Sequence, residues 1–263
     1  MLKPSGRSLK LVLAVTGAVA LSSALYANHS WGGYHWARTS NPFTLKLGDN
    51  VSSAWDSYLA TTSSDWSAST VLDTTIVPGG ANPRTCKATG GRVEVCNATY
   101  GNNGWLGVAS IWITGGTHIT QGTVKLNDTY FNTAKYNTTP WRNLVSCQEV
   151  GHTFGLDHQD ENFSNANLGT CMDYTNDPST NQHPNQDDYD ELAIIYSHLD
   201  STTTVGSAVS SPSSRAGQDE PGDGPRDWGR AVGADGNGRP NVYELDLGGG
   251  RKKVTHVFWA SSR

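Results

Sequence analysis

Residues 145–158 read VSCQEVGHTFGLDH, and this stretch decides what fold the sequence predicts. In an α-helix, side chains four residues apart lie on the same face, so Gln148 and His152 project side by side. Glu149 stands one position round the same helix. The spacing therefore predicts an amide, an imidazole and a carboxylate close together on one helix.

Gly155 predicts where this helix ends. It lies three residues after His152, and a glycine there suits a left-handed turn that stops the helix. The chain can then reverse and bring His158 to the same point in space. A second imidazole would thus join the first.

The residues from Glu149 to His158 resemble the zinc motif HExxHxxGxxH of the metzincins, and only its first letter differs, because Gln148 stands in place of His. Downstream, Cys171-Met172-Asp173-Tyr174 resembles the Met-turn of that family. Among metzincins, the matrixins (matrix metalloproteinases and their bacterial relatives) are the most similar in the order of strands and helices. The resemblance extends over the organisation of about 34–200 and implies a zincin fold.

The resemblance implies a zinc ion with three protein ligands and a water. His152 and His158 are implied as ligands, with Gln148 as the third, since its amide oxygen is neutral like an imidazole but is a weaker donor. His118 and His183 are further imidazoles that could replace the missing ligand, although a surface position is the commoner explanation for each. A decayed site without zinc is the alternative.

The same resemblance implies the chemistry. Zinc lowers the pKa of a bound water to about 7 and polarises a carbonyl. Glu149 is the implied general base, which passes a proton to the leaving amine, and Met172 is an apolar floor under the metal. Tyr174 stands where astacins and serralysins carry a tyrosine that approaches zinc; its phenol would complete the coordination, hydrogen-bond an oxyanion, or simply fill the core.

The charge and the first residues point to export and away from nucleic acid. The net charge is −5 and the 19 Lys and Arg are scattered, so no basic stripe exists. Lys3, Arg7 and Lys10 precede an apolar stretch that starts at Leu11, which predicts a signal peptide over 1–27 and a secreted, extracellular protein. An uncleaved anchor is the alternative, but an uncharged run of roughly 16 residues is shorter than the about 20 that a membrane span needs.

Secretion makes the four cysteines informative, because disulfides persist in oxidising compartments. Cys86 and Cys96 flank a glycine pair, and a hairpin with a three-residue loop centred on Gly91 would set them opposite one another. Cys147 would then pair with Cys171. Free thiols and the other connectivities of four cysteines stay open.

The remaining patterns predict an α+β fold, which the resemblance narrows to a mixed twisted sheet with about three helices. Alternating apolar residues and β-branched runs predict strands, and helical spacing with capping signals predicts helices. The expected strands are 43–47, 71–77, 92–100, 106–113 and 117–131. Three helices are expected, over 51–66, 141–154 and 186–198. Asp49 or Asn50 would cap the first helix, and the second would begin after Thr139 and Pro140.

Composition divides the chain after the signal peptide into a main domain over 28–200, a flexible linker over 201–225 and a C-terminal segment over 226–263, which is expected to form a β-hairpin. The resemblance implies that the main domain is a metzincin-like catalytic domain. The linker is rich in Ser, Thr, Pro and Gly. In the last segment, residues 241–247 and 253–260 alternate around three glycines and predict a β-hairpin. A lone hairpin is marginally stable, so we expect it to dock on the main domain.

Together these patterns favour a secreted zinc-dependent endopeptidase that acts on extracellular proteins or peptides. In matrixins an edge strand above the zinc helix pairs with the substrate backbone, and residues 106–113 match it by order. The alternative is a catalytically silent zincin-fold binding or adhesion module that has lost efficient zinc binding through Gln148.

Overall fold

The computed structural model describes residues 1, 29–207, 224 and 226–260. The expected signal peptide at 1–27 lies outside the described residues except for Met1, and so does most of the linker expected at 201–225. No helix within the described part of the chain is long and apolar enough to cross a bilayer.

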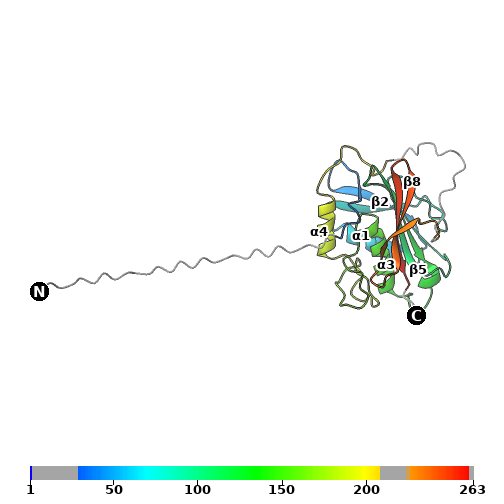
Figure 1. Cartoon of the computed structure of the whole chain (residues 1–263). Coiled ribbons are helices and arrows are strands. Elements are labelled where there is room, and N and C mark those ends of the chain that lie inside the picture. The colour runs from blue at the N-terminus through cyan, green and yellow to red at the C-terminus, as the bar shows by residue number, and fades with distance from the viewer. Residues whose placement is uncertain (2–28, 208–223, 225, 261–263) are drawn as a thin grey trace.

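A mixed sheet of nine strands forms the centre of the molecule (Figure 1). The strands are β1 (His35–Trp36), β2 (Phe43–Asn50), β3 (Leu72–Pro78), β4 (Val93–Ala98), β5 (Trp105–Thr114), β6 (His118–Asn127), β7 (Arg230–Ala234), β8 (Pro240–Gly248) and β9 (Arg251–Trp259). Their order is β3-β2-β4-β6-β5-β9-β8-β7, and β1 pairs with β6. Strand β2 pairs in parallel with β3 and β4, and β6 pairs in parallel with β1 and β4. The pairs β5–β6, β5–β9, β8–β9 and β7–β8 are antiparallel.

Four helices accompany this sheet in the described residues, so the expected α+β class is confirmed. They are α1 (Asp56–Trp66), α2 (Asp128–Phe131), α3 (Thr139–His152) and α4 (Gln186–Ile195). Thr138 caps α3 just before a proline in its first turn, and Asn185 forms a capping box with Asp188 at α4. The expected cap of α1 is wrong, because β2 continues through Asn50 and the helix begins only at Asp56.

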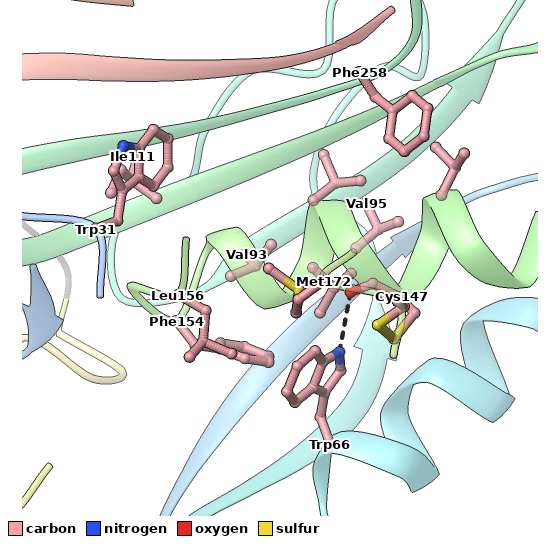
Figure 2. Packing of buried hydrophobic residues seen from close by; sticks show 14 of the residues in the cluster. Trp31, Trp66, Val93, Val95, Ile111, Cys147, Phe154, Leu156, Met172 and Phe258 are labelled. Atoms are coloured by element: carbon pink, nitrogen blue, oxygen red, sulfur yellow. Dashed lines mark hydrogen bonds between the residues drawn. A yellow bond between two sulfur atoms is a disulfide. The ribbon is translucent and has the colours of Figure 1, made fainter. Parts of the chain in front are cut away.

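Helix α3 is the element that carries the motif, and every residue from Trp141 to His152 is buried. Figure 2 shows the packing beneath it, where the indole Nε1–H of Trp66 donates to the carbonyl oxygen of Cys147 at 3.1 Å. Met172 packs against the same helix, since a Cβ on Gly151 would meet its sulfur at 2.8 Å. The helix is thus held on α1 and on the expected Met-turn.

Both expected disulfides are confirmed, Cys86 with Cys96 and Cys147 with Cys171. The second bridge ties α3 to the segment that contains Met172. The hairpin expected around the first bridge is wrong. Strand β4 begins at Val93 and pairs in parallel with β2 and β6, so Cys86 reaches Cys96 from a loop rather than from an adjacent strand.

The C-terminal hairpin docks on the main sheet, as expected. Strand β9 pairs antiparallel with β5 from Trp105 opposite Trp259 to Ile113 opposite Lys252, and Figure 1 shows these late strands, in orange and red, against the green β5. The expectation that 106–113 is an edge strand free to bind a peptide is therefore wrong. Strand β5 has a partner on each side, and the ends of the sheet are β3 and β7.

A separate aromatic cluster fixes the hairpin in place. It consists of the buried residues Trp105, Val108, Trp228, Val257 and Trp259. The Arg239 guanidinium lies 3.7 Å from the centre of the Trp259 ring, within cation–π range. Burying side chains of this size contributes about 1.5–3 kcal/mol each, so the cluster stabilises the docked position of the hairpin.

The turn after α3 needs glycine for two reasons, as expected from the sequence. Gly155 has φ +98°, a left-handed conformation that other residues rarely adopt. A Cβ at this position would also overlap the carbonyl oxygen of Tyr34. The chain therefore reverses here only because the side chain is absent.

We expect Gly155→Ala to destabilise the fold by about 2–5 kcal/mol, because left-handed backbone costs about 1–2 kcal/mol and the overlap adds about 1–3 kcal/mol. Gly169→Ala is the matched control, since Gly169 has φ +76° and a Cβ added there would have no neighbour within 4 Å. It isolates the backbone cost alone. Urea unfolding followed by tryptophan fluorescence measures both, and equal losses would show that the Tyr34 contact is no constraint.

Candidate metal centre

Three imidazoles meet at the end of α3. His152 is the last residue of the helix, His158 follows the Gly155 turn, and His256 arrives from β9. One ring nitrogen of each lies within 4.8 Å of the others, and all three side chains are buried. The His152 and His256 ring centroids are 3.9 Å apart. The structure thus joins the two expected histidines to a third from the C-terminal hairpin.

In each of these imidazoles, one ring nitrogen has a hydrogen-bond partner and the other has none. The bonded atoms are Nδ1 of His152 on the Leu156 carbonyl oxygen at 2.9 Å, Nδ1 of His158 on Glu161 Oε1 at 3.0 Å, and Nε2 of His256 on the Tyr174 hydroxyl at 3.0 Å. The remaining atoms, Nε2 of His152, Nε2 of His158 and Nδ1 of His256, are buried and have no hydrogen-bond partner. They are therefore the ring nitrogens available to an ion.

The bonded nitrogens decide which atoms carry lone pairs. A carbonyl oxygen only accepts, so His152 donates from Nδ1 and its Nε2 carries the lone pair. Burial raises the pKa of Glu161, but hydrogen bonds from His158 and Asn241 outweigh it and hold that pKa below its usual value. The charged carboxylate accepts from His158 Nδ1–H, which fixes the orientation of that ring.

This arrangement fits a transition metal. Metal-binding histidines characteristically donate their second ring nitrogen to a carbonyl or carboxylate oxygen, which fixes the ring. Burial and the neighbouring imidazoles lower the pKa values of His152 and His256 well below the usual range, so both rings are neutral, as ligands must be. Three imidazole nitrogens suit zinc among other divalent ions.

Glu149 lies beside the three imidazoles, between α3 and β5. Its Oε2 is 3.7 Å from Nδ1 of His256, and the side chain is fully buried. A Cβ on Gly107 would meet Oε1 at 2.6 Å, so glycine in β5 makes room for the carboxylate. Burial raises its pKa well above the usual range, and the backbone of Ala109 and Phe258 offsets this only in part. A bound cation would favour the charged form.

Gln148 also points into the interior, but its amide has another contact. Its Nε2 donates to the Cys171 carbonyl oxygen at 2.7 Å, while Oε1 is buried without a partner. The amide thus holds α3 against the expected Met-turn and keeps one oxygen unengaged. The third imidazole of the cluster is His256 and not a side chain from α3.

Tyr174 stands behind His256. Its hydroxyl bonds to Nε2 of that ring and accepts from Asn241 Nδ2 at 3.1 Å, and its ring stacks on Phe163 with centroids 4.7 Å apart. Burial raises the pKa of the phenol well above its usual value, so it stays neutral. The hydroxyl therefore orients a candidate ligand in this structure.

His256 was missed in the sequence, although one signal points to it. Strand β9 alternates between two environments, with Val254 and Phe258 in the main core and Val257 and Trp259 in the aromatic cluster. His256 shares the side that faces the main core, where a polar residue needs a partner.

The two spare imidazoles expected from the sequence lie elsewhere. His118 contacts Asp200 at 3.3 Å, and His183 contacts Asp65 at 2.7 Å on the surface. Neither side chain belongs to the buried cluster.

Trp31 covers the centre from the N-terminal side. Its ring centroid lies 5.6 Å from that of His152 and 6.2 Å from that of His256. The same side chain lines a pocket of about 240 Å³, whose wall includes Asp157 and Val254. Trp31 is thus shared by the pocket and the imidazole cluster.

Comparisons with known proteins do not assign this centre. No protein family matches the chain, and no curated protein is similar to it in sequence. The case for a metal therefore depends on the three imidazoles and Glu149.

We expect His256→Ala to lower zinc affinity by at least about 10–100-fold, the loss typical even of residues that only support a ligand. Gln148→Ala should lower zinc affinity less, because the Gln148 amide donates to the Cys171 carbonyl oxygen, whereas His256 has a ring nitrogen without a hydrogen-bond partner. Competitive chelator titration of both variants measures the difference, with near-ultraviolet circular dichroism as a check of the fold. A larger loss in Gln148→Ala would make the amide the third ligand.

Proposed function

We propose that the chain is a secreted zinc-dependent endopeptidase of the metzincin type, held here in a closed state. The observation that carries the proposal is a set of three buried imidazole nitrogens without partners beside the buried carboxylate of Glu149. The motif-like helix, the Gly155 turn and the position of Met172 below α3 support it. Two disulfides fit the oxidising compartment of an exported protein.

The candidate ligands and the carboxylate have separate roles. His152, His158 and His256 would hold the ion, which when bound supplies a Lewis acid and a water of lowered pKa. Glu149 accepts a proton and returns it to the leaving amine. Leu156 O and Glu161 keep the first two rings aligned, so neither of these two ligands has to reorient.

The closed state follows from the position of the C-terminal hairpin. Strand β9 fills the hydrogen-bonding edge of β5 that a peptide substrate would need, and it also inserts His256 into the cluster. We propose that β9 leaves β5 before a substrate binds. The unpartnered Oε1 of Gln148 would then be available on α3 as the third ligand in place of the departed imidazole.

A silent binding module is the second candidate. The enclosure favours it, since Glu149 and His152 are fully buried and β5 has two partners. In that case the metal would be structural, with the hairpin permanently in place. The two functions differ in whether the metal-loaded chain cleaves peptides under any condition.

We expect purified chain to contain zinc and to cleave an unfolded protein substrate, with cleavage abolished by a chelator. Glu149→Gln should reduce the rate of cleavage by about 10²–10⁴-fold, which is the usual rate contribution of a general base. The zinc content should stay at the wild-type value. Elemental analysis and a fluorogenic peptide assay measure the two quantities. Loss of zinc from this variant would show that Glu149 is a ligand, and zinc-loaded wild type without cleavage would favour the silent module.

We expect Trp228→Ala to increase peptide cleavage by the full chain. Trp228 is fully buried against Trp259 and Tyr243 and touches none of the candidate ligands. Its removal should weaken hairpin docking by about 3–5 kcal/mol, and Trp228→Phe should have a smaller effect. Hydrogen exchange of β9 amides reports opening, and faster exchange without faster cleavage would show that β9 is not what blocks the site.

A further inference from the structure

A second group of imidazoles gathers around Asp200, away from the buried centre. Oδ1 of Asp200 lies 3.3 Å from Nε2 of His118, 3.6 Å from Nε2 of His35 and 3.8 Å from Nε2 of His198. His35 belongs to β1 and His118 begins β6, whereas His198 and Asp200 follow α4. Three parts of the chain therefore contribute to one carboxylate oxygen.

Two of these imidazoles face each other as ligands of one ion would. Nε2 of His35 shares a hydrogen bond of 3.2 Å with Nε2 of His198, and the two ring planes are nearly perpendicular at 87°. Nitrogens bound at about 2.0–2.1 Å to a tetrahedral zinc lie about 3.3–3.4 Å apart. The ligand atoms of His35, His198 and Asp200 all lie within 4.8 Å of one another.

The outer contacts of these ligand atoms are already in place. His35 donates from Nδ1 to the Gly33 carbonyl oxygen at 2.9 Å, so its Nε2 carries the lone pair. Asp200 Oδ2 accepts from the backbone N–H and from Nη1 of Arg38, each at 3.1 Å. The other oxygen, Oδ1, is thereby turned toward the imidazoles.

The group is also open to an ion from solvent. His35 is buried, but 51% of the His198 side chain and 31% of the His118 side chain are exposed. An ion can therefore approach the group from the side of His198 without opening the fold. An exposed side also leaves a coordination position for water.

We propose that His35, His198 and Asp200 form a second metal site, which takes a divalent transition ion such as zinc, with His118 orienting the carboxylate. Two imidazoles and one carboxylate suit zinc, nickel or copper, whereas calcium and magnesium prefer oxygen ligands. The site shares no residue with the buried centre. It fastens β1 to the segment after α4, so its ion stabilises the folded state through binding.

The experiment counts zinc ions bound by the full chain after chelator treatment and dialysis. The first variant is His198→Ala, which removes an exposed ligand and leaves the core intact. The matched control is His183→Ala, another exposed imidazole, which contacts Asp65 at 2.7 Å outside both sites. Calorimetric titration gives the stoichiometry, and thermal unfolding with and without zinc gives the stabilisation.

We expect His198→Ala to bind one zinc ion fewer than wild type and to gain less in melting temperature when zinc is added. His183→Ala should match wild type in both. The difference of one ion is expected even if the buried centre holds none, so the two sites are tested separately. Equal stoichiometry in His198→Ala and wild type, or an equal loss in both variants, would overturn the proposal.

Discussion

The antiparallel pairing of β9 with β5 is the contact on which the buried centre depends. Its register places His256 opposite Ala109, so both side chains face α3. A slip of one residue would turn the imidazole to the opposite face of the sheet, because side chains alternate along a strand. A hydrogen bond between Ser110 and Thr255 at 3.0 Å, on the other face, helps to hold that register. The same pairing covers Glu149 and takes the edge that a peptide would use.

The buried centre and the Asp200 group represent two different electrostatic situations. At the first, three imidazole nitrogens are enclosed without hydrogen-bond partners beside the buried carboxylate of Glu149, and each such nitrogen destabilises the fold unless a cation compensates for it. Rigid supports surround them, including the Cys147–Cys171 bridge. At the second, Arg38 already neutralises Asp200, and exposed imidazoles allow water to stand in for an ion. For the two proposed sites, loss of a bound ion should therefore destabilise the fold more at the first than at the second.

Local features of this fold could be predicted from the sequence, whereas the contacts that complete the site could not. Helical spacing in α3 and the Gly155 turn depend on neighbouring residues, so the positions of His152 and His158 followed from the sequence. The contribution of His256 depends on which strand β9 joins and in which register, and no local pattern specifies either. The pairing of Cys86 with Cys96 was predicted for a wrong reason, because cysteine proximity does not require adjacent strands. The start of α1 was misplaced because β2 extends further than its alternation suggested.

The long separation between His158 and His256 has a consequence for biosynthesis. A chain emerges from the ribosome with its N-terminal part first, and contacts between distant residues form late. The helix that ends with His152 is therefore synthesised before β9, which carries His256. Until β9 is synthesised, the edge of β5 that it later occupies has no partner strand. In the proposed function, access of a peptide to β5 would thus depend on β9 from the moment at which the two strands pair.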